Sequence, residues 1–321
     1  MKILVNDALS PEAVELLRQH HEVDTNEYDP AELLVKIPDY DAIVVRGRTK
    51  VNAEVIQAGT NLKVIGRAGI GVDNVDVAAA SEREIEVVNA PSGSTYSVAE
   101  LTMGHIIAMA RMIPAADASM KAGKWEKKKF KGTELHGKTI GFIGLGRIGM
   151  EVAIRCRAFG MEIMAYDPYI GRNCVEDICA TMVDTPQELF AVCDVISIHT
   201  PLTDETRHLV GAEAFTAMKN SAFIINCARG GIIDEDALYH ALKDGQIKAA
   251  ALDSYESEPL KDSPLIELDN IFFTPHIGAS TKEAQIKAGT IVGGQVIKVL
   301  AGEQPDFCVN PWCKQRSRDN L

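Results

Sequence analysis

The chain has 321 residues, of which 46% are hydrophobic and 24% are charged, and its formal net charge at pH 7 is −12. This length and composition predict a globular protein of two ordinary domains, and the negative charge argues against nucleic acid or an anionic membrane as the main partner. No apolar run approaches the ~18 residues of a membrane span, and Asp7 interrupts the N-terminal apolar stretch, so we expect no signal peptide and a cytoplasmic location.

The first part of the chain alternates short apolar runs with helical patterns. Strands are predicted at residues 2–6, 41–46, 62–69 and 85–90, with helices at 10–20, 52–59 and 75–84 between them. The first helix has the start signals Ser10, Pro11 and Glu12. Near-continuous apolar strands that alternate with helices predict a parallel sheet covered on both faces.

The cluster at residues 91–95 (PSGST) breaks this pattern and marks a candidate domain boundary. A long helix is predicted at 97–113, and a basic segment follows at 121–132. A second strand–helix series then begins, with strands at 138–144, 161–167, 195–200, 222–228, 249–253 and 271–275, before a final helix at 283–300. The predicted fold class is therefore α/β, with two doubly wound parallel-sheet halves. Seven scattered cysteines predict reduced thiols, and their spacing suggests no metal site.

A nucleotide-binding loop follows the strand at 138–144. The sequence GLGRIG places Gly144, Gly146 and Gly149 between this strand and a helix, which is the setting of a dinucleotide fingerprint. The next strand ends at Asp167, where a carboxylate can accept from ribose hydroxyls and repel a 2′-phosphate. These features predict NAD as the cofactor. Arg172 follows closely, so NADP stays open as a second cofactor.

Polar side chains follow the later strands of this half, where open α/β sheets bind their ligands. One strand leads into His199 and Thr200, and the next leads into Cys227, Ala228 and Arg229. The last two strands lead into Asp253, with Glu256 and Glu258 in the loop after it, and into His276. The full set therefore comprises one arginine, two histidines and several carboxylates.

This set suits the oxidation of a hydroxy acid by a nicotinamide cofactor. The hydroxyl proton needs a base with a pKa near neutrality, for which histidine is suited. A nearby carboxylate such as Glu258 would orient His276. Arg229 can bind a substrate carboxylate with two parallel hydrogen bonds.

The motifs GLGRIG, NCARGG, SEP around Glu258 and PHIGAS resemble those of the D-isomer-specific 2-hydroxyacid dehydrogenase family, and the resemblance covers nearly the whole chain. The segments 67–76, 123–135 and 275–285 are most similar to members that oxidise D-3-phosphoglycerate at the first step of serine biosynthesis. The resemblance implies that Arg229, Glu258 and His276 are the catalytic residues, with His276 as general base. It implies cofactor contacts at Gly144, Gly146, Arg147, Ile148, Gly149, Asp167, Thr200, Cys227, Ala228, Asp253, Gly278 and Ala279.

The resemblance also implies a domain organisation. Residues 1–92 and 285–321 would form a flavodoxin-like substrate-binding domain, and 93–284 a Rossmann NAD-binding domain that carries a homodimer contact, with the active site in the cleft between. Because the sequence given ends at residue 321, we expect no C-terminal serine-binding regulatory domain.

The far end of the substrate would decide which 2-hydroxy acid is used. Arg46 and Arg48 follow the strand at 41–46, and side chains two apart in an extended segment point the same way. Two arginines suit a phosphate, and the family uses arginines here, which favours D-3-phosphoglycerate. Ile70 and Gly71 are further implied substrate contacts; some relatives have threonine in place of Ile70.

Two alternatives stay open. The first is another enzyme of the family, such as a glyoxylate or hydroxypyruvate reductase, which a substrate panel would reveal. The second is an NAD(H)-sensing binding protein like the C-terminal-binding corepressors, which would bind NADH without reducing any keto acid. The run Lys127–Lys129 is either a solvated face or, as the resemblance implies, part of the dimer contact near the neighbouring active site.

Overall fold

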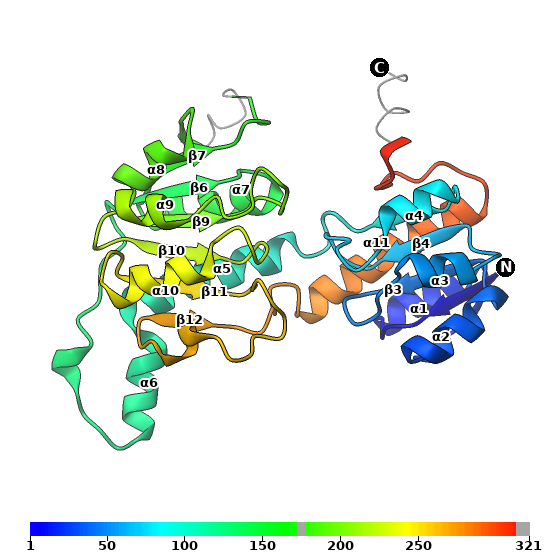
Figure 1. Ribbon diagram of the computed structural model, residues 1–321, viewed down its shortest axis with the longest axis horizontal. Coiled ribbons are helices and arrows are strands. Elements are labelled where there is room, and N and C mark those ends of the chain that lie inside the picture. The colour runs from blue at the N-terminus through cyan, green and yellow to red at the C-terminus, as the bar shows by residue number, and fades with distance from the viewer. Residues whose placement is uncertain (172–177, 313–321) are drawn as a thin grey trace. The chain divides into compact units, whose positions relative to one another are not determined.

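The computed structural model describes residues 1–171 and 178–312, and the chain divides into two compact units. One unit comprises Met1–Thr95 together with the stretch from Ala279 onward, and the other comprises Tyr96–Gly278. Each unit contains a parallel sheet with helices on both faces (Figure 1). The predicted α/β class with two doubly wound parallel sheets is confirmed.

The first unit has a five-stranded sheet in the order β2-β1-β3-β4-β5. Its strands are β1 (Lys2–Val5), β2 (Glu22–Asp24), β3 (Ala42–Val45), β4 (Val64–Arg67) and β5 (Glu86–Asn89). Its helices are α1 (Pro11–Arg18), α2 (Pro30–Lys36), α3 (Ala53–Ala58), α4 (Val77–Glu82) and α11 (Lys282–Leu300). The strand order reverses between β1 and β3, which is the point where doubly wound sheets bind ligands.

Side chains of this sheet alternate between two cores. Ile3, Val44 and Val64 pack in one cluster with Val292 and Val296 of α11. Their sequence neighbours pack in a second cluster with α2 and α3, as shown by Leu4, Ile43, Val45, Ile65, Leu33 and Ile56. Because both faces are buried, the strands appear in the sequence as continuous apolar runs.

The second unit has a seven-stranded sheet in the order β12-β11-β10-β9-β6-β7-β8. Its strands are β6 (Thr139–Ile143), β7 (Glu162–Tyr166), β8 (Thr181–Met182), β9 (Val195–Ile198), β10 (Phe223–Asn226), β11 (Ala249–Leu252) and β12 (Ile271–Phe273). Its helices are α5 (Thr95–Arg111), α6 (Ile113–Lys121), α7 (Arg147–Ala158), α8 (Pro186–Val192), α9 (Ala212–Ala217) and α10 (Glu235–Lys243). The strand order reverses between β6 and β9, so the ends of these strands form the second expected ligand position.

Two helix sets cover this sheet. Helices α5 and α7 pack on one face against residues such as Phe142 and Ile225, and α8, α9 and α10 pack on the other against residues such as Ile196 and Ile224. All seven strands are parallel. Their carboxyl ends therefore meet at one edge, where the loops that carry the candidate functional residues begin.

Several details differ from the sequence prediction. The helix expected at 97–113 ends at Arg111, because Met112 has a φ of +54° and a new helix, α6, starts at Ile113. Cys308 is disulfide-bonded, so the prediction of reduced thiols is wrong there, whereas Cys156, Cys193 and Cys227 are buried free thiols. Within residues 1–171 and 178–312, no helix combines the length and apolar character needed to cross a membrane.

Candidate active site

The glycine-rich loop after β6 has the backbone that a nucleotide loop requires. Gly144 has a φ of +87°, and a Cβ there would lie 2.9 Å from the carbonyl of His199. A Cβ on Gly146 would meet nothing within 4 Å, which leaves room for a ligand at the N-terminus of α7. A Cβ on Gly149 would lie 2.7 Å from the Gly144 oxygen, so this glycine lets helix and strand pack closely. The cradle fits a dinucleotide pyrophosphate.

Asp167 is held beside this loop by two backbone contacts. Its Oδ2 accepts from the N–H of Leu145 at 2.9 Å, and its Oδ1 accepts from the N–H of Tyr169 at 2.9 Å. A carboxylate has about four acceptor sites, so lone pairs remain for ribose hydroxyls. Arg172, which kept NADP open, lies outside the described residues.

Arg229 sits on a tight turn after β10. The buried Asn226 fixes this turn, since its Oδ1 accepts from the N–H of Ala228 at 3.0 Å and its Nδ2 donates to the Arg229 carbonyl at 2.8 Å. The next residue, Gly230, packs directly on the loop that leads to Glu258: a Cβ there would lie 1.8 Å from the carbonyl oxygen of Tyr255. The turn that carries Arg229 and the loop that carries Glu258 therefore touch backbone to backbone.

His276 and Glu258 contact each other, as the sequence predicts. The Nδ1 atom of His276 lies 2.8 Å from Oε2 and 2.9 Å from Oε1 of Glu258, while Oε1 also accepts from the N–H of Tyr255 at 3.2 Å. Because a carboxylate only accepts, Nδ1 is the donor in this contact, which leaves Nε2 as the ring nitrogen available for proton transfer. The two side chains are 47% and 39% exposed, so a substrate can reach them. His276 has a left-handed backbone with φ of +51°, a conformation that is rare outside glycine and often found at active sites.

A second carboxylate of the same loop, that of Glu256, contacts a different histidine. Glu256, which the sequence places two residues before Glu258, lies 3.0 Å from Nε2 of His208 through its Oε1. It is also linked to Glu235, because the N–H of Glu256 donates to Oε1 of Glu235 at 2.7 Å. Burial and the charges of Glu256 and Glu258 raise the pKa of Glu235. The structure thus assigns Glu258, and not Glu256, to His276.

Asp253 anchors the segment that carries His276. Its Oδ1 accepts from the Thr274 hydroxyl at 2.5 Å and from the N–H of Ile277 at 2.8 Å, and its Oδ2 accepts from the N–H of Gly278 at 2.8 Å. Only 1% of Asp253 is exposed. These contacts fix the backbone on both sides of His276.

A buried neutral network continues from Thr274. Nε2 of His105 lies 3.2 Å from the Thr274 hydroxyl, and Nδ1 of His105 lies 3.7 Å from Sγ of Cys227. Burial lowers the pKa of His105 against the opposing effect of Asp253, and burial raises the pKa of Cys227 to about 12. Both groups are therefore neutral near pH 7, which leaves Asp253 as the charge of this network.

Another neutral histidine lies under the glycine-rich loop. Burial lowers the pKa of His199 to about 3. Its Nε2 lies 2.8 Å from the Ser197 hydroxyl, and its ring stacks on Phe142 with a centroid separation of 5.8 Å. His199 thus supports the loop without adding charge.

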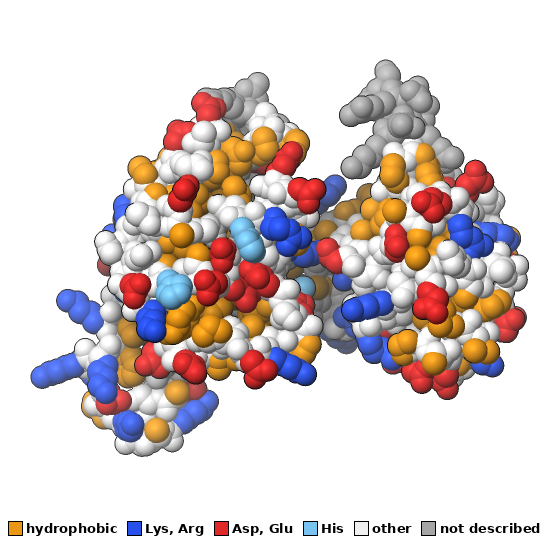
Figure 2. Space-filling model, in the orientation of Figure 1, with side chains coloured by type: hydrophobic (Ala, Val, Ile, Leu, Met, Phe, Trp, Pro, Cys, Tyr) orange, Lys and Arg blue, Asp and Glu red, His pale blue; other side chains and the backbone are white. Residues whose placement is uncertain are grey.

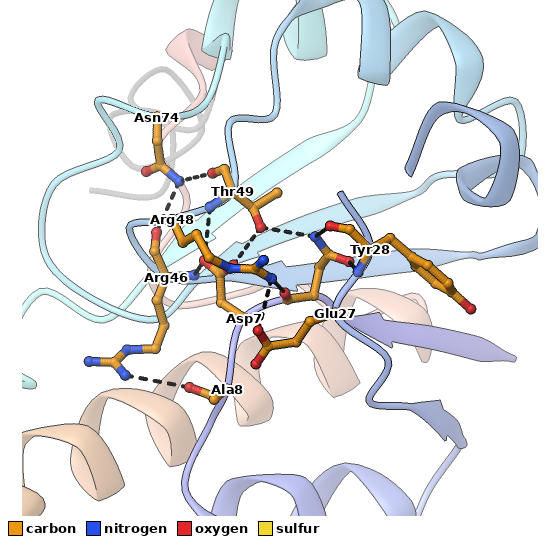
Figure 3. A network of polar contacts seen from close by, with 9 residues as sticks. Asp7, Ala8, Glu27, Tyr28, Arg46, Arg48, Thr49 and Asn74 are labelled. Carbon is orange, nitrogen blue, oxygen red and sulfur yellow. Dashed lines mark hydrogen bonds and ion pairs between the residues drawn. The ribbon is translucent and has the colours of Figure 1, made fainter. Parts of the chain in front are cut away.

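The predicted substrate residues of the first unit follow β3 and β4. Arg46 and Arg48 lie on the loop after β3, and Ile70 and Gly71 on the loop after β4. Figure 3 shows that the two guanidinium groups differ in their contacts. Arg48 binds Asp7 and Glu27, whereas Nη1 of Arg46 makes a long contact of 3.4 Å to the Ala8 carbonyl.

The structure brings the predicted residues together in two groups. The predicted catalytic residues and most predicted cofactor residues lie on strand-end loops or at the start of α7 in the second unit: Gly144, Gly146, Arg147, Ile148, Gly149, Asp167, Thr200, Cys227, Ala228, Arg229, Asp253, Glu258, His276 and Gly278. Ala279 begins the return to the first unit, which also contains Arg46, Arg48, Ile70 and Gly71.

Sequence reasoning missed several supporting residues: Asp7, Asn74, His105, Asn226 and Thr274. Asp7 and Asn226 could have been found, because each lies within two residues of a predicted strand end. His105 could not, because it lies inside a helix and reaches the site only through the fold.

Comparisons with known proteins show the family to which the chain belongs. Residues 103–278 match the family model described as the D-isomer specific 2-hydroxyacid dehydrogenase, NAD binding domain. A D-3-phosphoglycerate dehydrogenase from Methanocaldococcus jannaschii is 55% identical over 311 residues, which cover 97% of this chain and 59% of that protein. The chain thus spans about three fifths of that relative's length.

Two further relatives match over nearly their whole length. A hydroxypyruvate reductase from Thermotoga maritima is 49% identical over 93% of this chain and 98% of that protein. The crystal structure of the TT0316 protein from Thermus thermophilus superposes with a TM-score of 0.89 at 34% identity and covers 96% of this chain and all of that one. The chain belongs to the D-isomer specific 2-hydroxyacid dehydrogenase family, and its second unit carries the family's NAD-binding domain.

Proposed function

We propose that the chain oxidises D-3-phosphoglycerate to 3-phosphohydroxypyruvate with NAD, the first step of serine biosynthesis. The observation that carries this proposal is the contact of 2.8 Å between His276 and Glu258, next to the loop of Arg229. Histidine, carboxylate and arginine side chains on neighbouring strand ends of the NAD-binding unit support the roles of base, orienting group and carboxylate-binding cation.

Each of the three side chains has a distinct role. Nε2 of His276 takes the hydroxyl proton, and Glu258 stabilises the imidazolium that forms. Arg229 binds the substrate carboxylate and so fixes the orientation of the reacting carbon. The Gly144–Gly149 loop and Asp167 would hold NAD, which would supply the hydride acceptor.

The phosphate preference rests on the first unit and on the relatives. Arg46 offers a guanidinium at the point where the strand order of the five-stranded sheet reverses. The Methanocaldococcus relative is named a D-3-phosphoglycerate dehydrogenase. The name of the Thermotoga relative supports the rival, a hydroxypyruvate reductase, so the test must include both substrates.

The decisive experiment is a substrate panel in which the absorbance of NADH measures turnover. The purified chain is given NAD with D-3-phosphoglycerate, D-glycerate or D-lactate, and NADH with hydroxypyruvate. We expect kcat/KM for the phosphorylated acid to exceed that for D-glycerate by about 100-fold, since a hydrogen bond to a charged group contributes about 1.5–3 kcal/mol. Equal or greater activity with the unphosphorylated acids would reject the substrate and keep the family. NADH binding without any turnover would favour the corepressor-like alternative.

We also propose a cytoplasmic homodimer formed through the NAD-binding unit. Lysine and arginine side chains gather around α6 and the segment after it (Figure 2), where Trp125 is 80% exposed. A large exposed aromatic residue on such a segment suits a protein–protein contact. Light scattering should give the mass of a dimer, and a Trp125→Glu variant should shift the equilibrium toward monomer.

A further inference from the structure

The loop Arg46–Thr49 is held by two side chains from neighbouring loops of the first unit. Oδ2 of Asp7 accepts from the N–H of Arg46 at 2.6 Å and from the N–H of Thr49 at 3.2 Å. Nδ2 of Asn74 donates to the carbonyl of Arg46 at 2.9 Å and to the carbonyl of Thr49 at 2.7 Å. One carboxylate thus binds both N–H groups at the ends of the loop, and one amide binds both carbonyls (Figure 3).

We call Asp7 and Asn74, together with the Arg46 and Thr49 backbone groups that they bind, the clamp. The second oxygen of Asp7 connects this clamp to Arg48. Oδ1 of Asp7 accepts from the Thr49 hydroxyl and from Nε of Arg48, the latter at 3.2 Å. Nη2 of Arg48 then donates to the Asn6 carbonyl and lies 3.1 Å from Oε2 of Glu27. Asp7 is 3% exposed, and a buried carboxylate needs hydrogen bonds and a counter-charge to remain ionised. Arg48 supplies that charge.

The two arginines are therefore not equivalent. Arg48 is committed to Asp7 and Glu27, although its side chain is 52% exposed. The backbone of Arg46 is fixed at both its N–H and its carbonyl, while its guanidinium makes one long contact of 3.4 Å, to the Ala8 carbonyl, within the described residues. A fixed backbone with an uncommitted cationic end is the arrangement expected of a residue that binds an anionic ligand.

We propose that Asp7 and Asn74 are positioning residues that present Arg46 to the phosphate of the substrate, and that Arg48 is the counter-ion of Asp7 and not a second phosphate ligand. The assignment of the phosphate rests on the proposed function. The clamp itself does not, because it is defined by contacts within the first unit.

The test is a double-mutant cycle between Asp7 and Arg46. Asp7→Asn keeps the shape but turns an N–H₂ group toward Nε of Arg48 and the Thr49 hydroxyl. We expect KM for D-3-phosphoglycerate to rise about 10-fold, KM for D-glycerate to change less than twofold, and kcat to stay near wild type. Arg46→Ala should raise KM for the phosphorylated acid about 100-fold, and adding Asp7→Asn to Arg46→Ala should add little.

Two companion variants separate positioning from general damage. Asn74→Ala removes the other half of the clamp and should reproduce the pattern of Asp7→Asn. Asp39→Asn removes an exposed carboxylate of the same unit and should change no kinetic constant. Fully additive effects of Asp7→Asn and Arg46→Ala, or an equal loss with both substrates, would overturn the positioning role. A 100-fold rise in KM from Arg48→Ala would overturn the counter-ion role.

A second measurement tests the clamp without reference to any substrate. Hydrogen exchange of peptides that cover residues 46–49 should speed up by at least about 10-fold in Asp7→Ala and Asn74→Ala, with peptides of the second unit unchanged. If the wild type fails to oxidise D-3-phosphoglycerate but exchange increases as expected, the proposed function fails and the clamp stands. Unchanged exchange in both folded variants would reject the clamp.

Discussion

The two units build their candidate anion-binding loops in different ways. Each has a parallel sheet whose strand order reverses at one point, and each places a candidate anion-binding loop there. In the seven-stranded unit this loop is Gly144–Gly149, which offers backbone N–H groups at the start of α7, and Asp167 accepts from one of them, the N–H of Leu145. In the five-stranded unit the loop is Arg46–Thr49, which needs Asp7 and Asn74 to fix it. A site formed by backbone N–H groups suits a ligand that stays the same. A site formed by side chains can acquire a different ligand through a few substitutions.

This contrast suggests that the seven-stranded unit supplies the chemistry and the five-stranded unit supplies the choice of substrate. The strongest challenge to that division is His276→Asn. Since no other described side chain pairs with Glu258 as a base, kcat should fall by at least about 1,000-fold for every 2-hydroxy acid. Isothermal titration should show NADH affinity within about twofold of wild type. Activity that survives with any substrate would contradict the assigned base.

Arg229→Lys tests whether the second unit treats all substrates alike. A lysine keeps the charge but loses the two parallel hydrogen bonds to a carboxylate. We expect KM to rise about 100-fold for D-3-phosphoglycerate and D-glycerate equally, because both acids carry the carboxylate. An effect confined to the phosphorylated acid would mean that Arg229 binds the phosphate and not the carboxylate. It would contradict the division of roles between Arg229 and Arg46.

Acid should destabilise the second unit through two of its histidines. His199, with a pKa of about 3, and His105, with a lowered pKa, are neutral in the native second unit. The unfolded chain binds protons at histidine below about pH 6.5, so the stability that neutral His199 contributes is lost as pH falls from 6.5 toward 3, by up to about 1.4 kcal/mol per pH unit. His105 acts in the same direction.

Urea unfolding at pH 7 and pH 5 measures this loss. His199→Asn should make the unfolding free energy less sensitive to pH by about 1–2 kcal/mol over that interval. The matched control is His240→Asn, which changes an exposed histidine of the same unit and should leave the pH dependence unchanged. Equal pH dependence in wild type and His199→Asn would mean that His199 is not held neutral.

The smallest expected effect is at Lys129. Its Nζ lies 2.6 Å from Oε1 of Glu126, and its side chain is 70% exposed. If the segment helps a neighbouring active site in a dimer, Lys129→Ala should raise KM for D-3-phosphoglycerate about twofold to threefold and leave D-glycerate unchanged. Lys121→Ala, which removes a similarly paired and exposed lysine, is the control. An unchanged KM would leave substrate choice to the five-stranded unit alone.

Much of the candidate site could be predicted from the sequence. The pairing of His276 with Glu258 followed from strand ends and from a family motif, since parallel strands bring their carboxyl ends to one edge. The short elements β2 and β8 could not be predicted, because strands of two or three residues at a sheet edge carry almost no periodicity.

The clamp on Arg46 was also beyond the sequence. Residue spacing indicated that Arg46 and Arg48 share a side, but it could not show that Arg48 turns to Asp7 and Glu27. The orientation of Arg48 depends on which donors each carboxylate oxygen of the buried Asp7 accepts from. Such contacts join residues about 40 positions apart, so local patterns do not encode them.

The backbone contact at Gly230 has a consequence for engineering. Because a Cβ there would overlap Tyr255, any substitution must displace the turn of Arg229 and the loop of Glu258 together. The two loops therefore cannot be optimised one at a time, and libraries that vary position 230 should contain mainly inactive proteins. Directed evolution toward new hydroxy acids can vary the loop after β3 more freely, because a change of Arg46 leaves the residues of proton transfer, His276 and Glu258, unaltered.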